Sequence, residues 1–169
     1  MTRWQKIVHK IELRLGEIQV ASGFRTDAGL NRILIDTESD PERAFGGQEF
    51  DAGLVIQMDP AEPADEQGEI RPGGAMMVMY TRQLSVFGYR RTVDRENWFD
   101  RAQELEADIK QTVFSHPEDQ QFYKQIGLRS IRIGTAESTI PGYGDEYLGT
   151  QVALEITYVE NLSDPWEPA

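Results

Sequence analysis

A chain of 169 residues with a net charge of −12 and no cysteine is about one domain long, and its composition argues against several classes of protein. A general nucleic-acid binder needs a basic stripe to neutralise phosphates, and a disulfide framework or a thiolate metal site needs cysteine. Hydrophobic residues make up 39% of the chain, enough for a core, but no apolar run approaches the roughly 20 residues that span a bilayer. We expect an intracellular protein with a single domain, residues 1–169.

The first segment is predicted to be an amphipathic helix. Thr2 begins a capping-box pattern, and apolar residues recur at spacings of three and four over residues 4–18. We expect the helix to end between residues 15 and 21. His9 lies in this helix without a partner at metal-ligand spacing, so we interpret it as a surface or interface residue.

Two short apolar runs follow, residues 31–36 and 52–58, and both predict strands. They bracket the start of a long acidic loop region, residues 36–74, which carries eleven acidic residues against two arginines between Asp36 and Arg71. Proline and glycine exclude continuous regular structure over residues 59–74, which predicts an ordered hairpin excursion or a disordered one. A loop of this length is either a binding surface or a solvated segment.

The centre of the chain combines the longest strand-forming run with the best-capped helix. Residues 76–89 are rich in Met, Val, Tyr, Thr and Phe. The run is far longer than a usual strand, so we expect a bend or bulge near Gly88 or at residues 82–83 and two shorter strands in tandem. Asp94 is the expected cap of an amphipathic helix over residues 95–114.

The last part of the chain alternates between turn signals and strand signals. A short helix is expected between Pro117 and Gly127, a strand over residues 128–133, a turn region over 134–144, and a strand over 148–159. Residues 160–169 are expected to form an irregular tail. The order of elements predicts an α+β fold, with an antiparallel or mixed β-sheet and amphipathic helices packed mainly on one face.

No motif in the chain indicates catalysis. Asp108 and Lys110 loosely resemble the Asp/Glu-x-Lys pair of metal-dependent nucleases, but there the pair lies on a strand, where both side chains share a face. Here the pair lies on the predicted helix, so we interpret both residues as part of its solvated face. Glycine-rich phosphate loops and a catalytic triad are also missing from the pattern. We therefore expect no enzyme, with no catalytic, cofactor-binding or metal-binding residues and no cofactor.

Candidate interface residues come from the basic and aromatic positions. Four arginines form the main basic concentration and are expected to pair either with the acidic loop or with an acidic face of a neighbouring subunit. Trp166 is expected either to anchor the tail on a neighbour or to fold back over its own sheet, since tryptophan is enriched at interface hot spots. The candidate interface set is Arg82, Arg90, Arg91, Arg95, Phe45, Phe50 and Trp166.

The layout of the chain resembles a known family. The N-terminal amphipathic helix, the strand through residues 83–89, the helix over 95–114 and the final strand over 152–158, which Asp164-Pro165-Trp166 follow, resemble the tail terminator, or tail completion, proteins of long-tailed bacteriophages. The chain departs from the shorter members of this family in its acidic insertion between Asp36 and Arg71.

The resemblance implies a structural virion protein that assembles as a ring, usually a homohexamer. Such a ring caps the tail tube, contacts the tail tube protein on one face and the head-tail connector or stopper protein on the other, and belongs to the neck of the virion after assembly in the host cytoplasm. DNA passes through its lumen without specific binding, which an acidic wall favours, and no membrane is involved. The alternatives are another head-tail joining or neck protein and, further away, a metal-dependent nuclease.

Overall fold

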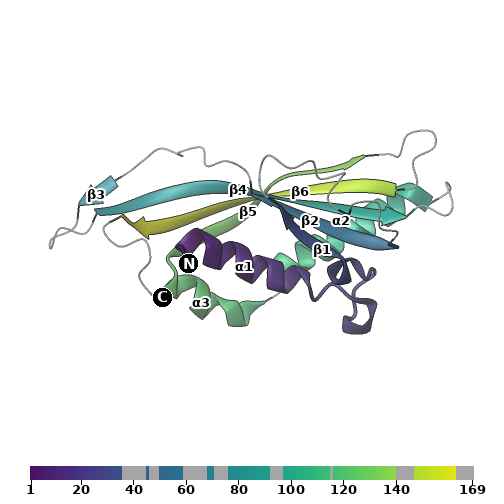
Figure 1. The fold of residues 1–169 in the computed structure, drawn as a ribbon, viewed down its shortest axis with the longest axis horizontal. Helices are drawn as coiled ribbons and strands as arrows, with labels where there is room; N and C mark the ends of the chain where they lie inside the picture. The colour runs from purple at the N-terminus through teal and green to yellow at the C-terminus, as the bar shows by residue number, and fades with distance from the viewer. Residues whose placement is uncertain are drawn as a thin grey trace.

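The computed structural model describes residues 1–35, 45, 50–58, 68–70, 76–91, 97–114, 116–139 and 147–162. Its strands form one mixed sheet in the order β1-β2-β4-β6-β5, and β3 pairs with the start of β4. Figure 1 shows α1 and α3 together beneath this sheet. The prediction of an α+β fold with helices mainly on one face of a mixed sheet is confirmed.

The elements have the following bounds. The strands are β1 Arg32–Ile35, β2 Ala52–Met58, β3 Gly68–Ile70, β4 Met76–Arg91, β5 Leu128–Thr139 and β6 Tyr147–Asn161. The α-helices are α1 Arg3–Leu15, α2 Trp98–Phe114 and α3 Gln120–Gln125, and short 3₁₀ turns cover Val20–Ser22, Ala28–Leu30 and Pro117–Asp119.

Helix α1 begins where the sequence predicts. The Gln5 backbone N–H donates to the Thr2 hydroxyl oxygen at 3.2 Å, and the Thr2 N–H donates to the Gln5 side-chain oxygen at 2.9 Å, which completes the capping box. Its apolar face, from Trp4 to Leu15, is buried against the sheet. The helix ends at Leu15, within the predicted range.

Strand β4 corrects one prediction. It runs unbroken for 16 residues, and it pairs with β6 from Met77 opposite Asn161 to Arg91 opposite Tyr147 without a shift in register. The expected bulge and the expected division into two strands are wrong, because β6 is almost as long and supplies a continuous partner. Gly88 instead leaves room for α2 on the sheet. A Cβ atom at this position would lie 2.7 Å from Leu105 Cδ2, so only glycine lets the helix pack this closely.

The last two strands are also longer than predicted. β5 continues to Thr139 through residues expected to form a turn, and its register against β6 shifts between Leu128 and Ser130 and again between Ile133 and Ala136. These irregularities interrupt the alternation of apolar and polar residues along β5, which explains why the sequence predicts a strand only up to residue 133. β6 includes Glu160 and Asn161, so the predicted tail begins at least two residues too early.

The acidic loop region 36–74 contains described strands at two places. The predicted strand over residues 52–58 is confirmed as β2, which pairs parallel with β1 and antiparallel with β4. Residues 68–70 form β3 and pair antiparallel with the start of β4, as the ordered alternative predicts.

The core lies between the sheet and the helices. Alternate residues of β4 and β6 point to this face, including Leu84, Val86, Leu154 and Ile156, and all four are buried. α2 contributes the predicted apolar stripe of Ala102, Leu105, Ile109 and Val113. The predicted short helix is confirmed as α3, and it is followed by buried Ile126 and by Gly127 with a positive φ of 76°. The expected cap of α2, Asp94, lies outside the described residues.

Candidate functional site

Asp108 is a structural carboxylate in the interior. It is 3% exposed, and its two oxygens accept hydrogen bonds from the Arg25 backbone N–H at 3.1 and 3.2 Å and from the Thr26 hydroxyl at 2.9 Å. The prediction that Asp108 lies on a solvated helix face is wrong, because the turn after α1 covers this part of α2. Its neighbour Lys110 pairs with Glu106, one helical turn earlier.

This geometry does not suit metal catalysis at Asp108. A metal ion there would have to displace the hydrogen-bond donors of Arg25 and Thr26 from a buried carboxylate. In the part of the chain that the structure describes, no group of three His, Cys, Asp or Glu side chains is arranged to hold a metal ion. Within the same ranges, no helix is both long and apolar enough to cross a membrane.

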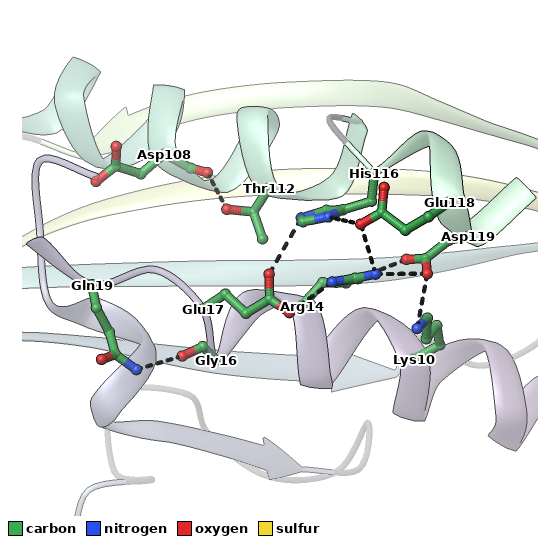
Figure 2. A network of polar contacts seen from close by, with 10 residues as sticks. All are labelled: Lys10, Arg14, Gly16, Glu17, Gln19, Asp108, Thr112, His116, Glu118 and Asp119. Carbon is green, nitrogen blue, oxygen red and sulfur yellow. Dashed lines mark hydrogen bonds and ion pairs between the residues drawn. The ribbon is translucent and has the colours of Figure 1, made fainter. Parts of the chain in front are cut away.

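A polar network joins α1 to the segment before α3. Figure 2 shows Lys10 and Arg14 of α1, with Glu17 just after the helix, facing His116, Glu118 and Asp119. Arg14 Nε and Nη2 donate to the two oxygens of Asp119, each at 2.7 Å, and Lys10 Nζ lies 2.9 Å from Asp119 Oδ1. The hydrogen bonds from Arg14 hold the pKa of Asp119 at about 2, well below its ordinary value, and Asp119 raises the pKa of Arg14 in return. This bidentate pair fixes the position of α3 relative to α1.

His116 extends this network on its outer side. Its Nδ1 lies 2.9 Å from Glu118 Oε1, and its Nε2 lies 3.5 Å from Glu17 Oε2. The hydrogen bond with His116 lowers the pKa of Glu118. His9, by contrast, is exposed and contacts only Glu12 of its own helix among the described contacts, at 3.3 Å, in keeping with the prediction of a surface residue.

Arg82 lies on the helix face of β4, in a niche of aromatic rings. Its guanidinium carbon is 5.4 Å from the ring centroid of Trp4, 5.7 Å from that of Tyr80 and 6.0 Å from that of Tyr158. Tyr158 stacks on both other rings, with centroid separations of 5.8 Å. Burial raises the pKa of Tyr158 strongly, and the nearby positive charge of Arg82 opposes this shift. We call this group of Arg82, Trp4, Tyr80 and Tyr158 the Arg82 niche.

The other predicted arginines have different surroundings. Arg90 Nη1 donates to Glu104 Oε2 of α2 at 2.7 Å, so its partner is neither the acidic loop nor a neighbouring subunit. Arg91 lies on the opposite face of the sheet, as its pairing with Tyr147 indicates, and its backbone N–H donates to the Asp51 carbonyl at 2.7 Å. Arg95 lies outside the described residues.

Phe45 and Phe50 belong to an aromatic cluster with Tyr89 and Tyr147. The rings of Phe45 and Phe50 are 4.2 Å apart between centroids, Phe45 meets Tyr89 at 6.2 Å, and Phe50 meets Tyr147 at 4.8 Å. Tyr89 and Tyr147 both point away from the helices, so this cluster covers one end of the opposite face of the sheet. Both phenylalanines keep partial exposure. Trp166, the remaining candidate, lies outside the described residues.

The sheet has a strand with an unpaired edge at each side. Among the described strands, nothing pairs with the outer edge of β1 or with that of β5. The outer half of β5 is exposed from Arg132 to Ser138. Unpaired edges of this kind are templates for pairing with another chain. The sequence did not reveal this property for β5, because its outer half was predicted to be a turn.

Comparison with known proteins does not indicate a function, so the functional proposal depends on the geometry described above. No protein-family model matches this chain, and no curated protein matches it.

Proposed function

We propose that this chain is the subunit of a ring that caps the tail tube of a long-tailed bacteriophage and joins it to the head connector. The α+β layout and the resemblance of its elements to tail terminator proteins support this function. The observation that carries the proposal is the sheet with two dissimilar edges, β1 and β5, with which no described strand pairs.

The strand directions suit a ring. β1 pairs parallel with β2, and every later pair on the path to β5 is antiparallel, so β1 and β5 run in opposite directions. Joining β5 of one copy to β1 of the next therefore makes an antiparallel contact. A contact between two different surfaces generates a ring when the rotation closes, whereas a contact between identical surfaces stops at a dimer.

The edges cannot supply the whole interface. β1 contributes four residues, whereas a stable protein interface buries about 1,200–2,000 Å² in total. Further contacts have to come from side chains beside the strands. The proposed set is still Arg82, Arg90, Arg91, Arg95, Phe45, Phe50 and Trp166. Arg90 is the weakest member because Glu104 already occupies its guanidinium.

The charge of the chain is compatible with DNA transit. A net charge of −12 on each copy makes a ring that repels phosphate, so duplex DNA passes through the lumen without adhering. Another head-tail joining or neck protein would share this property and the same edges. The two functions differ in the partner that the ring binds: a terminator recognises the end of a tail tube.

The test is size-exclusion chromatography with light scattering at several protein concentrations, with and without cognate tail tubes. The proposal predicts a discrete closed multiple of the 19.2 kDa chain, six copies by the resemblance, either alone or on addition of tubes. A chain that stays monomeric under both conditions contradicts the proposal. Tight binding of the assembled ring to duplex DNA at low salt also contradicts it, because a conduit for DNA must not retain it.

A further inference from the structure

Among the described residues, the guanidinium of Arg82 has aromatic neighbours but no carboxylate partner. In the described part of the chain, Arg14 and Arg90 each have an acidic partner within 3 Å, whereas the contacts of Arg82 are the three rings of its niche. Its Nε atom is buried without a hydrogen-bond acceptor, and the hydroxyl of Tyr158 in the same niche is also buried and unsatisfied. Glu160 lies on the same face of β6 but forms no described ion pair with Arg82.

The aromatic rings satisfy only part of what a guanidinium requires. A ring below the guanidinium plane stabilises the positive charge, but the N–H groups point outward in that plane and still need acceptors. Unsatisfied polar groups are costly when they are buried. The niche therefore orients Arg82 with Nε enclosed, while its two Nη atoms are not among the buried unsatisfied atoms. The Nη edge of a guanidinium can donate two parallel hydrogen bonds to a planar carboxylate.

The backbone beside Arg82 pairs with no described strand on the β2 side of β4. β2 pairs with β4 only from Leu84 onward, and β3 pairs only with Met76 to Val78. Residues 79–83 of β4 therefore have no partner strand on that side among the described residues, and the Arg82 side chain keeps partial exposure. Figure 1 shows the N-terminal end of α1, which carries Trp4, against the half of the sheet that β4 and β6 extend past β2.

We propose that the Arg82 niche is a binding site for a carboxylate side chain, and that a second copy of this chain supplies that carboxylate. Each copy carries 29 acidic residues against 17 Lys and Arg, so a neighbouring copy offers many acidic side chains to an arginine that has no acidic partner among the described residues of its own chain. This inference rests on the proposed ring, and it assigns to one residue a contact between adjacent subunits. A buried ion pair of this kind fixes the relative orientation of the copies.

The test compares self-association of three variants with that of the unaltered chain by sedimentation velocity over a range of concentrations. Arg82→Gln removes the charge, Arg82→Lys keeps the charge but not the two parallel hydrogen bonds, and Arg25→Gln removes an exposed arginine away from both edge strands as the matched control. We expect Arg82→Gln to weaken association by about 10- to 100-fold, Arg82→Lys to weaken it less, and Arg25→Gln to leave it unchanged. Equal association constants for Arg82→Gln and Arg25→Gln overturn the inference while leaving the ring intact.

Two further outcomes separate the occupant of the niche from the ring itself. If Arg82→Gln lowers thermal stability equally at all concentrations without changing association, the carboxylate comes from the same chain and the inference is overturned. If the unaltered chain never associates, the ring fails. A titration with a tetraglutamate peptide, followed by the intrinsic tryptophan fluorescence to which Trp4 contributes, then tests the niche separately. A saturable change that Arg82→Gln abolishes and tetraglutamine does not produce supports a carboxylate site, and its absence overturns one.

Discussion

Replacing Asp108 with alanine tests whether this residue is structural. The substitution leaves the Arg25 N–H and the Thr26 hydroxyl without their acceptor in a site that is 3% exposed. A hydrogen bond to a charged group contributes about 1.5–3 kcal/mol, and the higher helix propensity of alanine returns about 0.6 kcal/mol. We therefore expect Asp108→Ala to lower the free energy of unfolding by about 3 kcal/mol. In a chain of 169 residues, that loss lowers Tm by about 6–12 °C.

Urea unfolding followed by circular dichroism measures this cost. Asp100→Ala is the matched control, since Asp100 lies in the first turn of the same helix but is exposed, and its loss should cost less than about 1 kcal/mol. In a Thr26→Val background the cost of Asp108→Ala should fall by about 1 kcal/mol, because one of the two donors is already gone. Equal costs for Asp108→Ala and Asp100→Ala would refute the structural role. Mg²⁺-dependent DNA cleavage by the unaltered chain that Asp108→Ala abolishes would restore the nuclease alternative.

Three further predictions test the packing described above. Because Arg14 holds the pKa of Asp119 at about 2, the carboxylate stabilises the fold above pH 4 and loses this effect as the pH falls toward 2. Urea titrations measure the free energy of unfolding at pH 5 and at pH 2. The decrease between the two pH values should be about 2 kcal/mol larger for the unaltered chain than for Asp119→Asn. Gly127→Ala should lower the free energy of unfolding by about 2–3 kcal/mol, because φ is 76° and the new Cβ would lie 2.8 Å from a backbone oxygen. Gly23→Ala should lower it by only about 1 kcal/mol, because φ is 94° but no atom lies within 4 Å of the new Cβ. Equal Tm values for the two variants would contradict this explanation. In the same urea assay, Glu104→Gln should lower the free energy of unfolding by less than about 1 kcal/mol, since the Glu104 side chain is 42% exposed and solvent screens its pair with Arg90. A larger decrease would mean that this pair contributes more to stability than an exposed pair should.

The features that local sequence determines were predictable. The capping box at Thr2, the apolar stripe of α2 and the glycine that ends α3 depend on residues within a few positions of one another. The inward orientation of Arg82 could also have been predicted, since strand alternation places it on the same face as Leu84 and Val86. Its partner Trp4 was already assigned to the buried face of α1.

The features that depend on distant residues were not predictable. The length of β4 is set by β6, whose paired residues lie 56–84 positions further along the chain. Asp108 is buried because Arg25 and Thr26, more than 80 positions earlier, fold over it. The outer half of β5 follows a register shift against β6, which removes the alternation that a strand prediction requires. In each case, the residues nearby in the sequence do not indicate which distant residues will pair with or cover the segment.

The most direct test of the ring is a covalent cross-link between β1 and β5 of neighbouring copies. The chain has no cysteine, so cysteines placed at Leu34 and Ile133, which are 40% and 39% exposed on the helix face of the two edge strands, are the only thiols. With a short bismaleimide reagent, the Leu34→Cys, Ile133→Cys double variant should give a ladder of covalent oligomers that ends at one closed species, and each single variant should remain monomeric. Dimers from a single variant as abundant as those from the double variant, or no cross-linking at all, would contradict the ring.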